Sequence, residues 1–166
     1  LLDFARKEKY DFVPTNINET IERAVEMVQH ELIQRSVQLE FKADDNLPDV
    51  MASADHLHGL WLNLIINAID ASDSSILEDR KGKIEIETFH DNKFVKVRVG
   101  DNGQGMSKEK VKRIFEPFFT TKEPNKGTGL GLSVSHRVIR QHGGDVQVES
   151  EPNVGTTFII TLPIYR

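Results

Sequence analysis

Five short segments of the chain alternate apolar and polar residues, and this period of two limits the fold more than any other feature of the sequence. Successive side chains of a β-strand point to opposite faces of a sheet, so each segment offers a single apolar face. Residues 90–92 separate the second segment from the third, and residues 151–154 separate the fourth from the fifth, so both pairs are predicted to be antiparallel hairpins. The segments are VQLEFKA, KIEIETF, KFVKVRVG, DVQVES and GTTFIITL.

An amphipathic helix is predicted before the first of these strands. Thr15 or Asn18 can cap its beginning, and it is expected to end near Ser36. Its apolar residues recur at three- and four-residue spacing, which places them on one face of a helix. They are Ile21, Ala24, Val25, Val28 and Leu32.

Two further helices complete the predicted secondary structure. One begins at residues 52–54 and runs to about Ala71, and the other runs from about Leu130 to Gln141, where a pair of glycines stops it. We therefore expect an α/β (α+β) fold, a two-layer sandwich in which a mixed, largely antiparallel sheet carries helices on one face.

Composition points to one ordinary globular domain. The chain has 166 residues, no cysteine and a net charge of −5, which argues against disulfides, thiolate metal sites and a surface for nucleic acid. No stretch is long and apolar enough to cross a bilayer, so we expect a cytoplasmic domain whose parent reaches a membrane only through other regions. Residues 1–10 are interpreted as the end of an upstream helix, and residues 11–166 as the domain itself.

Polar side chains interrupt the predicted helix NLIINAIDAS. Asn63, Asn67 and Asp70 line one stripe beside the apolar one, although asparagine is a poor helix former. Amide oxygens are hard ligands that suit a magnesium ion bridging phosphates. The alternative is a solvated helix face.

The segment DNGQGM follows an apolar strand. It places Asp101 at the end of that strand, while Gly103 and Gly105 allow the backbone to approach a ligand closely. A carboxylate only accepts hydrogen bonds, so it would take the exocyclic amino group of adenine and repel the carbonyl of guanine. The alternative is a simple Asp-Asn-Gly turn.

The segment GTGLGLSV leads into the last predicted helix. Its first amide groups and the positive end of the helix dipole suit phosphates, although a plain linker into a helix is the alternative. The Rossmann fingerprint is excluded because Leu132 stands in place of the third glycine, and the P-loop ending is missing. The segment supplies Gly127, Thr128, Gly129, Leu130 and Gly131.

A polar stretch with three phenylalanines, FEPFFTTKEPNKGTG, precedes that segment. It is typical of a nucleotide lid, which we place at about residues 106–128, held closed by aromatic anchors such as Phe115. Thr120, Thr121 and Lys122 can offer hydroxyls and a positive charge to phosphates. A loop pinned to the core by its phenylalanines is the alternative, and it is compatible with a lid.

Five segments resemble, in order and spacing, the sequence boxes of histidine kinases. They are NLIINAIDA for the N box, DNGQGM for the first glycine box, FEPFFTTK for the F box, and GTGLGL and GTTF for two further glycine boxes. The wider resemblance is to gyrase B, Hsp90, MutL and histidine kinases, and it implies the Bergerat fold with ATP and Mg²⁺ as cofactors. It implies Asn67 as the magnesium ligand, Asp101 as the adenine reader, and Asn63, Asn67 and Lys122 as catalytic residues. Other residues that it places on the nucleotide are Asp70, Gly103, Gly105, Met106, Phe115, Thr120, Thr121, Thr156 and the second glycine box, including Leu132.

Asn63 favours a kinase within this family, because the related ATPases carry a glutamate there to activate water, and an amide is no base. Such a domain would bind ATP with little turnover by itself. A conformational-clamp ATPase and a serine kinase of the anti-sigma or dehydrogenase-kinase type are the alternatives. Asp70 is a departure, since many histidine kinases have lysine or arginine there, although kinases of the nitrogen-regulator type resemble NAIDA.

The phosphate acceptor is expected outside this chain. His30 begins a His-Glu-Leu sequence, but Arg35 stands where an acceptor box has proline. LLDFARKEK resembles the end of the dimerisation helix that precedes the catalytic domain. The resemblance therefore implies an upstream dimerisation and histidine-phosphotransfer domain, a homodimeric parent protein, and the receiver domain of a response regulator as partner.

Overall fold

The structure is a computed structural model that describes residues 10–117, 119 and 131–165. Its strands are β1 (Val13–Thr15), β2 (Gln38–Lys42), β3 (Val50–Ala52), β4 (Lys83–His90), β5 (Phe94–Asp101), β6 (Asp145–Glu151) and β7 (Gly155–Pro163). Its helices are α2 (Ile17–Met27), α3 (Gln29–Gln34), α4 (Ala54–Ser72), α5 (Lys108–Arg113) and α6 (Gly131–Gln141).

The main sheet has the strand order β2-β4-β5-β7-β6. β2 runs parallel to β4, and the other neighbours are antiparallel, so the mixed and largely antiparallel sheet is confirmed. Both predicted hairpins, β4–β5 and β6–β7, are present. Alternation within β5 buries Val95, Val97 and Val99 and turns Lys96 and Arg98 outward.

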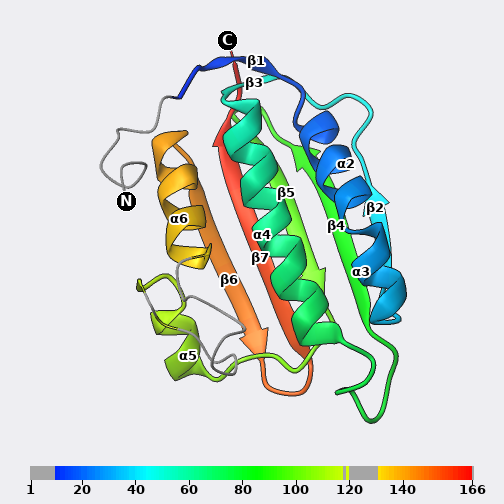
Figure 1. Cartoon of the computed structure of the whole chain (residues 1–166). Helices are drawn as coiled ribbons and strands as arrows, with labels where there is room; N and C mark the ends of the chain where they lie inside the picture. Colours follow the sequence, from blue (N-terminus) through cyan, green and yellow to red (C-terminus); the bar gives the residue numbers. More distant parts are fainter. Residues whose placement is uncertain (1–9, 118, 120–130, 166) are drawn as a thin grey trace, which may run out of the picture.

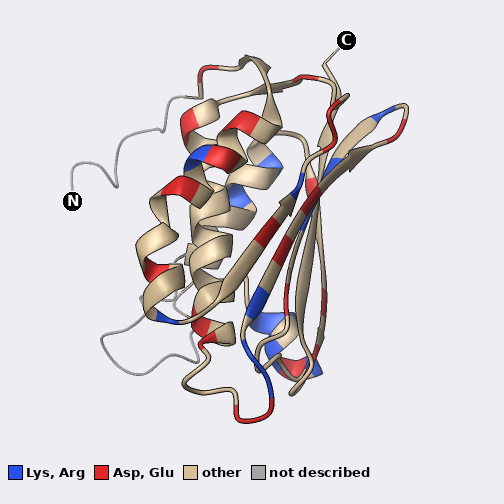
Figure 2. Ribbon diagram, turned by 90° about the vertical axis from the view of Figure 1, so that its right-hand side faces the viewer, with Lys and Arg blue, Asp and Glu red and all other residues tan. Residues whose placement is uncertain are grey.

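Helices α2, α3, α4 and α6 cover one face of this sheet, and Figure 1 shows α4 in the middle of that layer. The charged outer face of the strands is seen in Figure 2. Trp61 of α4 is 1% exposed, and its indole N–H donates to Thr20 of α2 over 2.8 Å, which joins the two helices inside the core. The predicted two-layer sandwich is therefore confirmed.

The beginning of the predicted first helix is corrected by the structure. Asn16 caps α2 by accepting from the amide of Glu19, whereas Thr15 ends β1. Asn18 lies inside α2, and its side chain bonds the Asp44 carbonyl and the Thr88 hydroxyl. The pattern missed this cap because neighbouring Asx and Thr residues offer similar capping oxygens.

The same region contains two helices instead of one. α2 ends at Met27, and α3 begins at Gln29 after a break at Val28. Both keep the apolar stripe facing the core, since Ile21 and Ala24 of α2 and Leu32 of α3 are buried. The short strands β1 and β3 pair as a separate antiparallel ribbon, and this ribbon and α5 are additions to the predicted elements.

No helix in the described part of the chain is both long and apolar enough to span a membrane.

Candidate nucleotide-binding site

Asn63 joins α4 to the beginning of α6. Its side-chain amide donates to the carbonyl of Gly131 over 3.0 Å and to the hydroxyl of Ser135 over 3.3 Å. A Cβ atom at Gly131 would lie 3.3 Å from the Asn63 carbonyl oxygen, so glycine permits this close approach. The half-buried Asn67 lies one turn further along α4. Two predicted site residues, Asn63 and Gly131, are therefore in direct contact.

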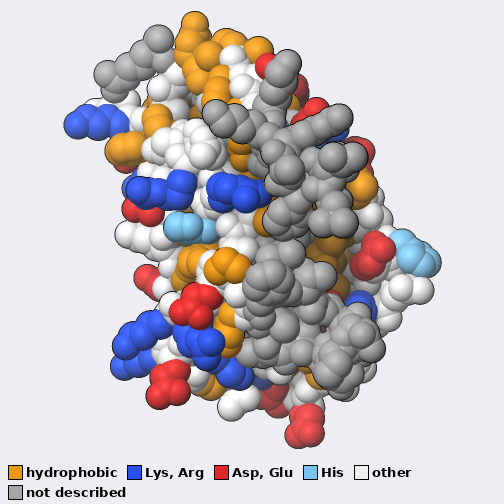
Figure 3. Space-filling model, turned by 60° about the vertical axis from the view of Figure 1, so that its left-hand side comes forward, with side chains coloured by type: hydrophobic (Ala, Val, Ile, Leu, Met, Phe, Trp, Pro, Cys, Tyr) orange, Lys and Arg blue, Asp and Glu red, His pale blue; other side chains and the backbone are white. Residues whose placement is uncertain are grey.

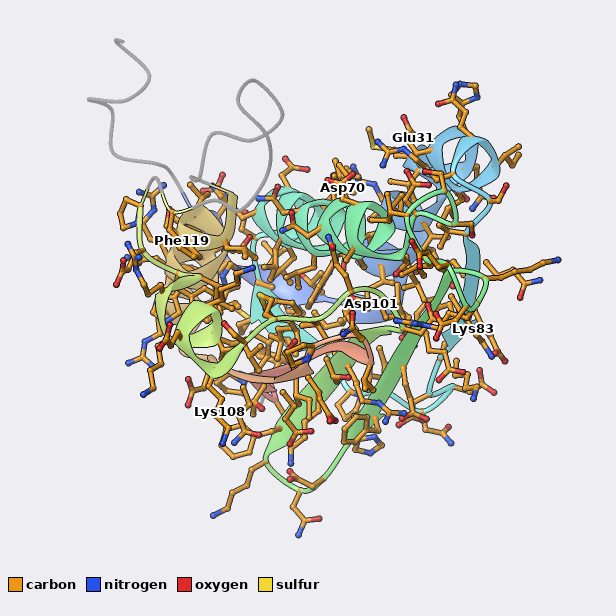
Figure 4. All side chains as sticks on the ribbon, turned by 90° about the horizontal axis from the view of Figure 1, so that it is seen from below. Glu31, Asp70, Lys83, Asp101, Lys108 and Phe119 are labelled. Carbon is orange, nitrogen blue, oxygen red and sulfur yellow. The ribbon has the colours of Figure 1, made fainter. Side chains whose placement is uncertain are left out.

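Asp70 contacts another element. Its carboxylate lies 3.1 Å from the guanidinium of Arg35, which follows α3 and also bonds Asp73. Figure 1 shows α3 and α6 on opposite sides of α4, and Figure 4 shows Asp70 on the side of α4 turned away from the sheet. Asn63, Asn67 and Asp70 nevertheless share one face of the continuous helix α4, as the spacing predicts, and the contact of Asp70 with a nucleotide stays a prediction.

Asp101 ends β5 on the face of the sheet that the helices cover, below α4 in Figure 4. Burial raises the pKa of this carboxyl from 3.8 to about 6, although hydrogen bonds from the backbone amides of Gly103 and Thr156 lower it in part. The Gly103 amide donates over 2.8 Å. The structure thus keeps a partly desolvated acceptor at the edge of the core.

The backbone after Asp101 is held from two sides. The amide of Gln104 donates to the carbonyl of Ala71 at the end of α4, and the amide of Asn153 donates to the carbonyl of Gln104. Gly105 has a φ of +66°, and a Cβ atom there would lie 2.0 Å from the carbonyl oxygen of Glu151. A side chain at position 105 is therefore excluded by both conformation and space.

Ser150 is a residue of this site that the motifs did not reveal. Its hydroxyl accepts from the amide of Met106 over 2.8 Å and lies 2.7 Å from the hydroxyl of Thr156, which is buried. The alternation of β6 was the available signal, because it turns Ser150 toward the helices together with Val146 and Val148. Thr156 and Met106, both predicted, are thereby connected.

The beginning of the predicted lid packs on the core. The Phe115 ring lies 5.0 Å from the ring of His136 on α6 and 6.5 Å from that of Phe158 on β7. The Arg113 guanidinium lies 4.7 Å from the centre of the Phe119 ring. Basic side chains gather over α5 and α6 beside the residues that are not described (Figure 3).

Several predicted contacts lie outside the described residues, namely Thr120, Thr121, Lys122, Gly127, Thr128, Gly129 and Leu130. Leu132 is described, and it packs against the core from the first turn of α6. Hollows are present among the described residues. One of about 490 Å³ lies between α3 and β2, and one of about 310 Å³ is lined by outward side chains such as Arg98 and reaches Asp101. The contacts, and not a hollow, define the candidate site.

Known proteins resemble this chain over nearly its whole length. The sensor histidine kinase ZraS of Escherichia coli K12 is 35% identical over 164 residues, which are 99% of this chain and 34% of ZraS. The chain thus spans about a third of the length of this relative. The catalytic domain of histidine kinase ThkA is 32% identical, with 93% of this chain and 98% of that domain covered and a TM-score of 0.79.

A structure of ThkA in complex with response regulator protein TrrA matches with a TM-score of 0.80 and 27% identity over 99% of this chain and 45% of that one. The family model described as histidine kinase-, DNA gyrase B-, and HSP90-like ATPase matches residues 52–166. The chain therefore belongs to this ATPase family, and within it to the catalytic domains of sensor histidine kinases.

Proposed function

We propose that this domain binds Mg²⁺-ATP and transfers the γ-phosphoryl group to a histidine on an upstream dimerisation domain. The bond between the γ-phosphorus and its bridging oxygen breaks, a phosphorus–nitrogen bond to the imidazole forms, and ADP leaves. A response regulator's receiver domain then takes the phosphoryl group. The parent protein acts as a homodimer, with this domain on the cytoplasmic side.

The contact of Asn63 with α6 is the observation that favours a kinase over a clamp ATPase. Its amide hydrogens are directed to Gly131 and Ser135, so the side chain holds the start of α6 and has no basic atom for a water molecule. A clamp ATPase needs a general base at this place. The site therefore suits the delivery of ATP to an outside nucleophile, in which positioning supplies much of the rate.

Adenine recognition is assigned to Asp101. A desolvated carboxylate next to Gly103 can accept from the exocyclic amino group, and the burial of Asp101 strengthens that interaction relative to water. Gly105, Met106 and Thr156 surround the same strand end. The phosphates are assigned to the beginning of α6 and to Thr120, Thr121 and Lys122 of the lid, which we place at residues 106–128.

The residues present fit a magnesium ion that arrives with the nucleotide. Among the described residues no group of three or more His, Cys, Asp or Glu could hold a metal. Mg²⁺ is commonly bound by few protein ligands together with water and substrate phosphates, and the Asn67 amide oxygen is of the right type. When bound, the ion would neutralise charge on the transferring phosphate.

The transfer is tested by incubating this domain with γ-labelled ATP, Mg²⁺ and the histidine-bearing domain. A phosphohistidine, which acid hydrolyses and alkali preserves, is expected on the added domain. An acid-stable product would indicate a serine kinase. Steady ATP hydrolysis by this domain alone, at the rate of clamp ATPases, would overturn the kinase assignment.

Asn67→Ala is expected to abolish the magnesium dependence of nucleotide binding, because the proposed ligand is removed. Calorimetric titration with ATP, with and without Mg²⁺, measures this dependence. Asn46→Ala, at an exposed loop position, is the matched control and should bind as the parent domain does. Unchanged metal dependence in Asn67→Ala would show that the ligand lies elsewhere.

A further inference from the structure

Helices α4 and α6 have a second polar connection at the end away from Gly131. The imidazole Nε2 of His142 accepts from the backbone amide of Ser53, which precedes α4, over 3.1 Å. Its Nδ1 lies 2.8 Å from the carbonyl oxygen of Val138 in α6 and donates to it. These two bonds fix one neutral tautomer. His142 is only 6% exposed, so both bonds are shielded from water.

The two connections lie far apart along the helices. Ser53 precedes Asn63 by ten residues, and His142 follows Gly131 by eleven. At 1.5 Å per residue, the connections are separated by about 15 Å along each axis. α4 and α6 are thus joined at two points, one inside the candidate site and one at the opposite end.

Aromatic rings from the segment that enters the domain cover the second connection. The Tyr10 ring stacks on the imidazole of His56 at 4.0 Å, and Phe12 meets His142 edge-on at 5.1 Å. The hydroxyl of Ser53 lies 2.6 Å from Nδ1 of His56. Rings from the entering segment therefore cover both imidazoles.

We propose, resting on the function proposed above, that His142 is a positioning residue for the nucleotide site. Its neutral imidazole fixes the spacing between α4 and α6, and so holds Gly131 at the correct place beside Asn63. The Tyr10–Phe12 segment protects this connection, which links the entering chain to the site.

Protonation would break the connection, because Nε2–H would face the Ser53 N–H and two donors would oppose each other. The titratable side chains next to His142 are His56 of α4 and Tyr10 of the entering segment. The charged pair nearest to His142 in the sequence is formed by Arg140 and Asp145. Burial lowers the pKa of His142; the bond to Val138 opposes this shift and His56 adds to it. The connected state is therefore favoured at neutral pH, and the open state gains as the pH falls below about 6.5.

The spacing can be measured directly, because the chain has no cysteine. Spin labels on Asp55→Cys and Gln141→Cys, both exposed positions, report the distance between the two helix ends. We expect a narrow distribution in the parent domain at pH 7.5, broadening in His142→Phe. His142→Gln keeps an acceptor that does not titrate, so its distance distribution should stay narrow as the pH is lowered in steps from 7.5, whereas that of the parent should broaden. His58→Gln on α4 is the control and should behave as the parent.

Nucleotide binding supplies the second readout, by calorimetry well below the melting temperature. His142→Phe should bind the ATP analogue AMPPNP about tenfold more weakly, because the buried bond between the two helices, from Ser53 to His142, is lost, and His142→Gln should restore most of the affinity. Weaker binding with unchanged distances, or altered distances with unchanged binding, would each overturn the positioning role. If the parent domain binds no nucleotide, the proposed function fails, while the label distances still test the connection by themselves. If His142→Phe does not fold, the pH comparison between the parent and His142→Gln decides.

Discussion

At the scale of single residues, Asp101, the proposed adenine reader, is buried at a cost to its charged form. Its pKa is raised because the charged form is desolvated, and the same desolvation would strengthen a hydrogen bond from adenine. Asp101 is therefore expected to lower the stability of the free domain at neutral pH.

Asp101→Asn is expected to bind adenine nucleotides more weakly and to gain stability relative to the parent as the pH rises. Because the folded-state pKa is about 6 and the ordinary value is 3.8, the contribution of Asp101 to stability is full below 3.8 and is lost as the pH rises through 6. The difference in unfolding free energy between Asp101→Asn and the parent should therefore change by up to about 3 kcal/mol over this pH range. Urea unfolding at several pH values measures it, and a difference that is independent of pH would contradict the assignment.

Gly105→Ala should destabilise the domain by about 2 to 4 kcal/mol. A left-handed backbone disfavours alanine, and the new Cβ atom would lie 2.0 Å from the Glu151 carbonyl oxygen, which must then move. Chemical unfolding would measure the loss. A stability equal to that of the parent would show that the turn relaxes without strain.

At the scale of elements, the sequence predicted long periodic segments well. α4 and the hairpins β4–β5 and β6–β7 were found because their patterns extend over many residues. β1, β3 and α5 are too short to show a period, and the break at Val28 has no glycine or proline to announce it. The motifs predicted Asp101 and Asn63 as site residues, but they could not predict the bonds of Asp70 to Arg35 and of Ser150 to Met106, because these depend on distant segments.

Gly59→Ala should stabilise α4, with the unfolding free energy raised by about 1 kcal/mol, because alanine is a better helix former. Gly59 is exposed inside α4, and nothing lies within 4 Å of the position that a Cβ atom would take. This variant is the matched counterpart of Gly105→Ala in the same unfolding assay. A loss of stability would mean that the helix surface is more crowded there than the structure shows.

At the scale of the whole molecule, one core joins the helices to the sheet. The single tryptophan, Trp61, lies in its centre and is bonded to Thr20. The fold class followed from strand alternation, and the order of the motifs is the basis of the proposed site. The sequence did not show that α4 and α6 are connected at both ends, because His142 and Ser53 are 89 residues apart.

The domain is expected to unfold in a single transition, since one core is shared by α2, α4 and the sheet. The fluorescence of Trp61 and the far-ultraviolet circular dichroism should therefore give coincident urea curves. Curves with separate midpoints would indicate that the helical layer and the sheet lose structure independently.

The placement of the described chain ends has a practical consequence. The described part of the chain begins and ends at the end of the molecule that carries β1 and β3, opposite the lower end of β5 (Figure 1), and the amide of Tyr165 donates to the carbonyl of Asp49 just before β3. A fluorescent protein or a surface tether joined directly to residue 10 or residue 165 would attach at the end of the domain away from Asp101, the last residue of β5. Immobilised binding assays and tandem fusions are therefore feasible from both ends, although an N-terminal attachment should leave Tyr10 and Phe12 in place.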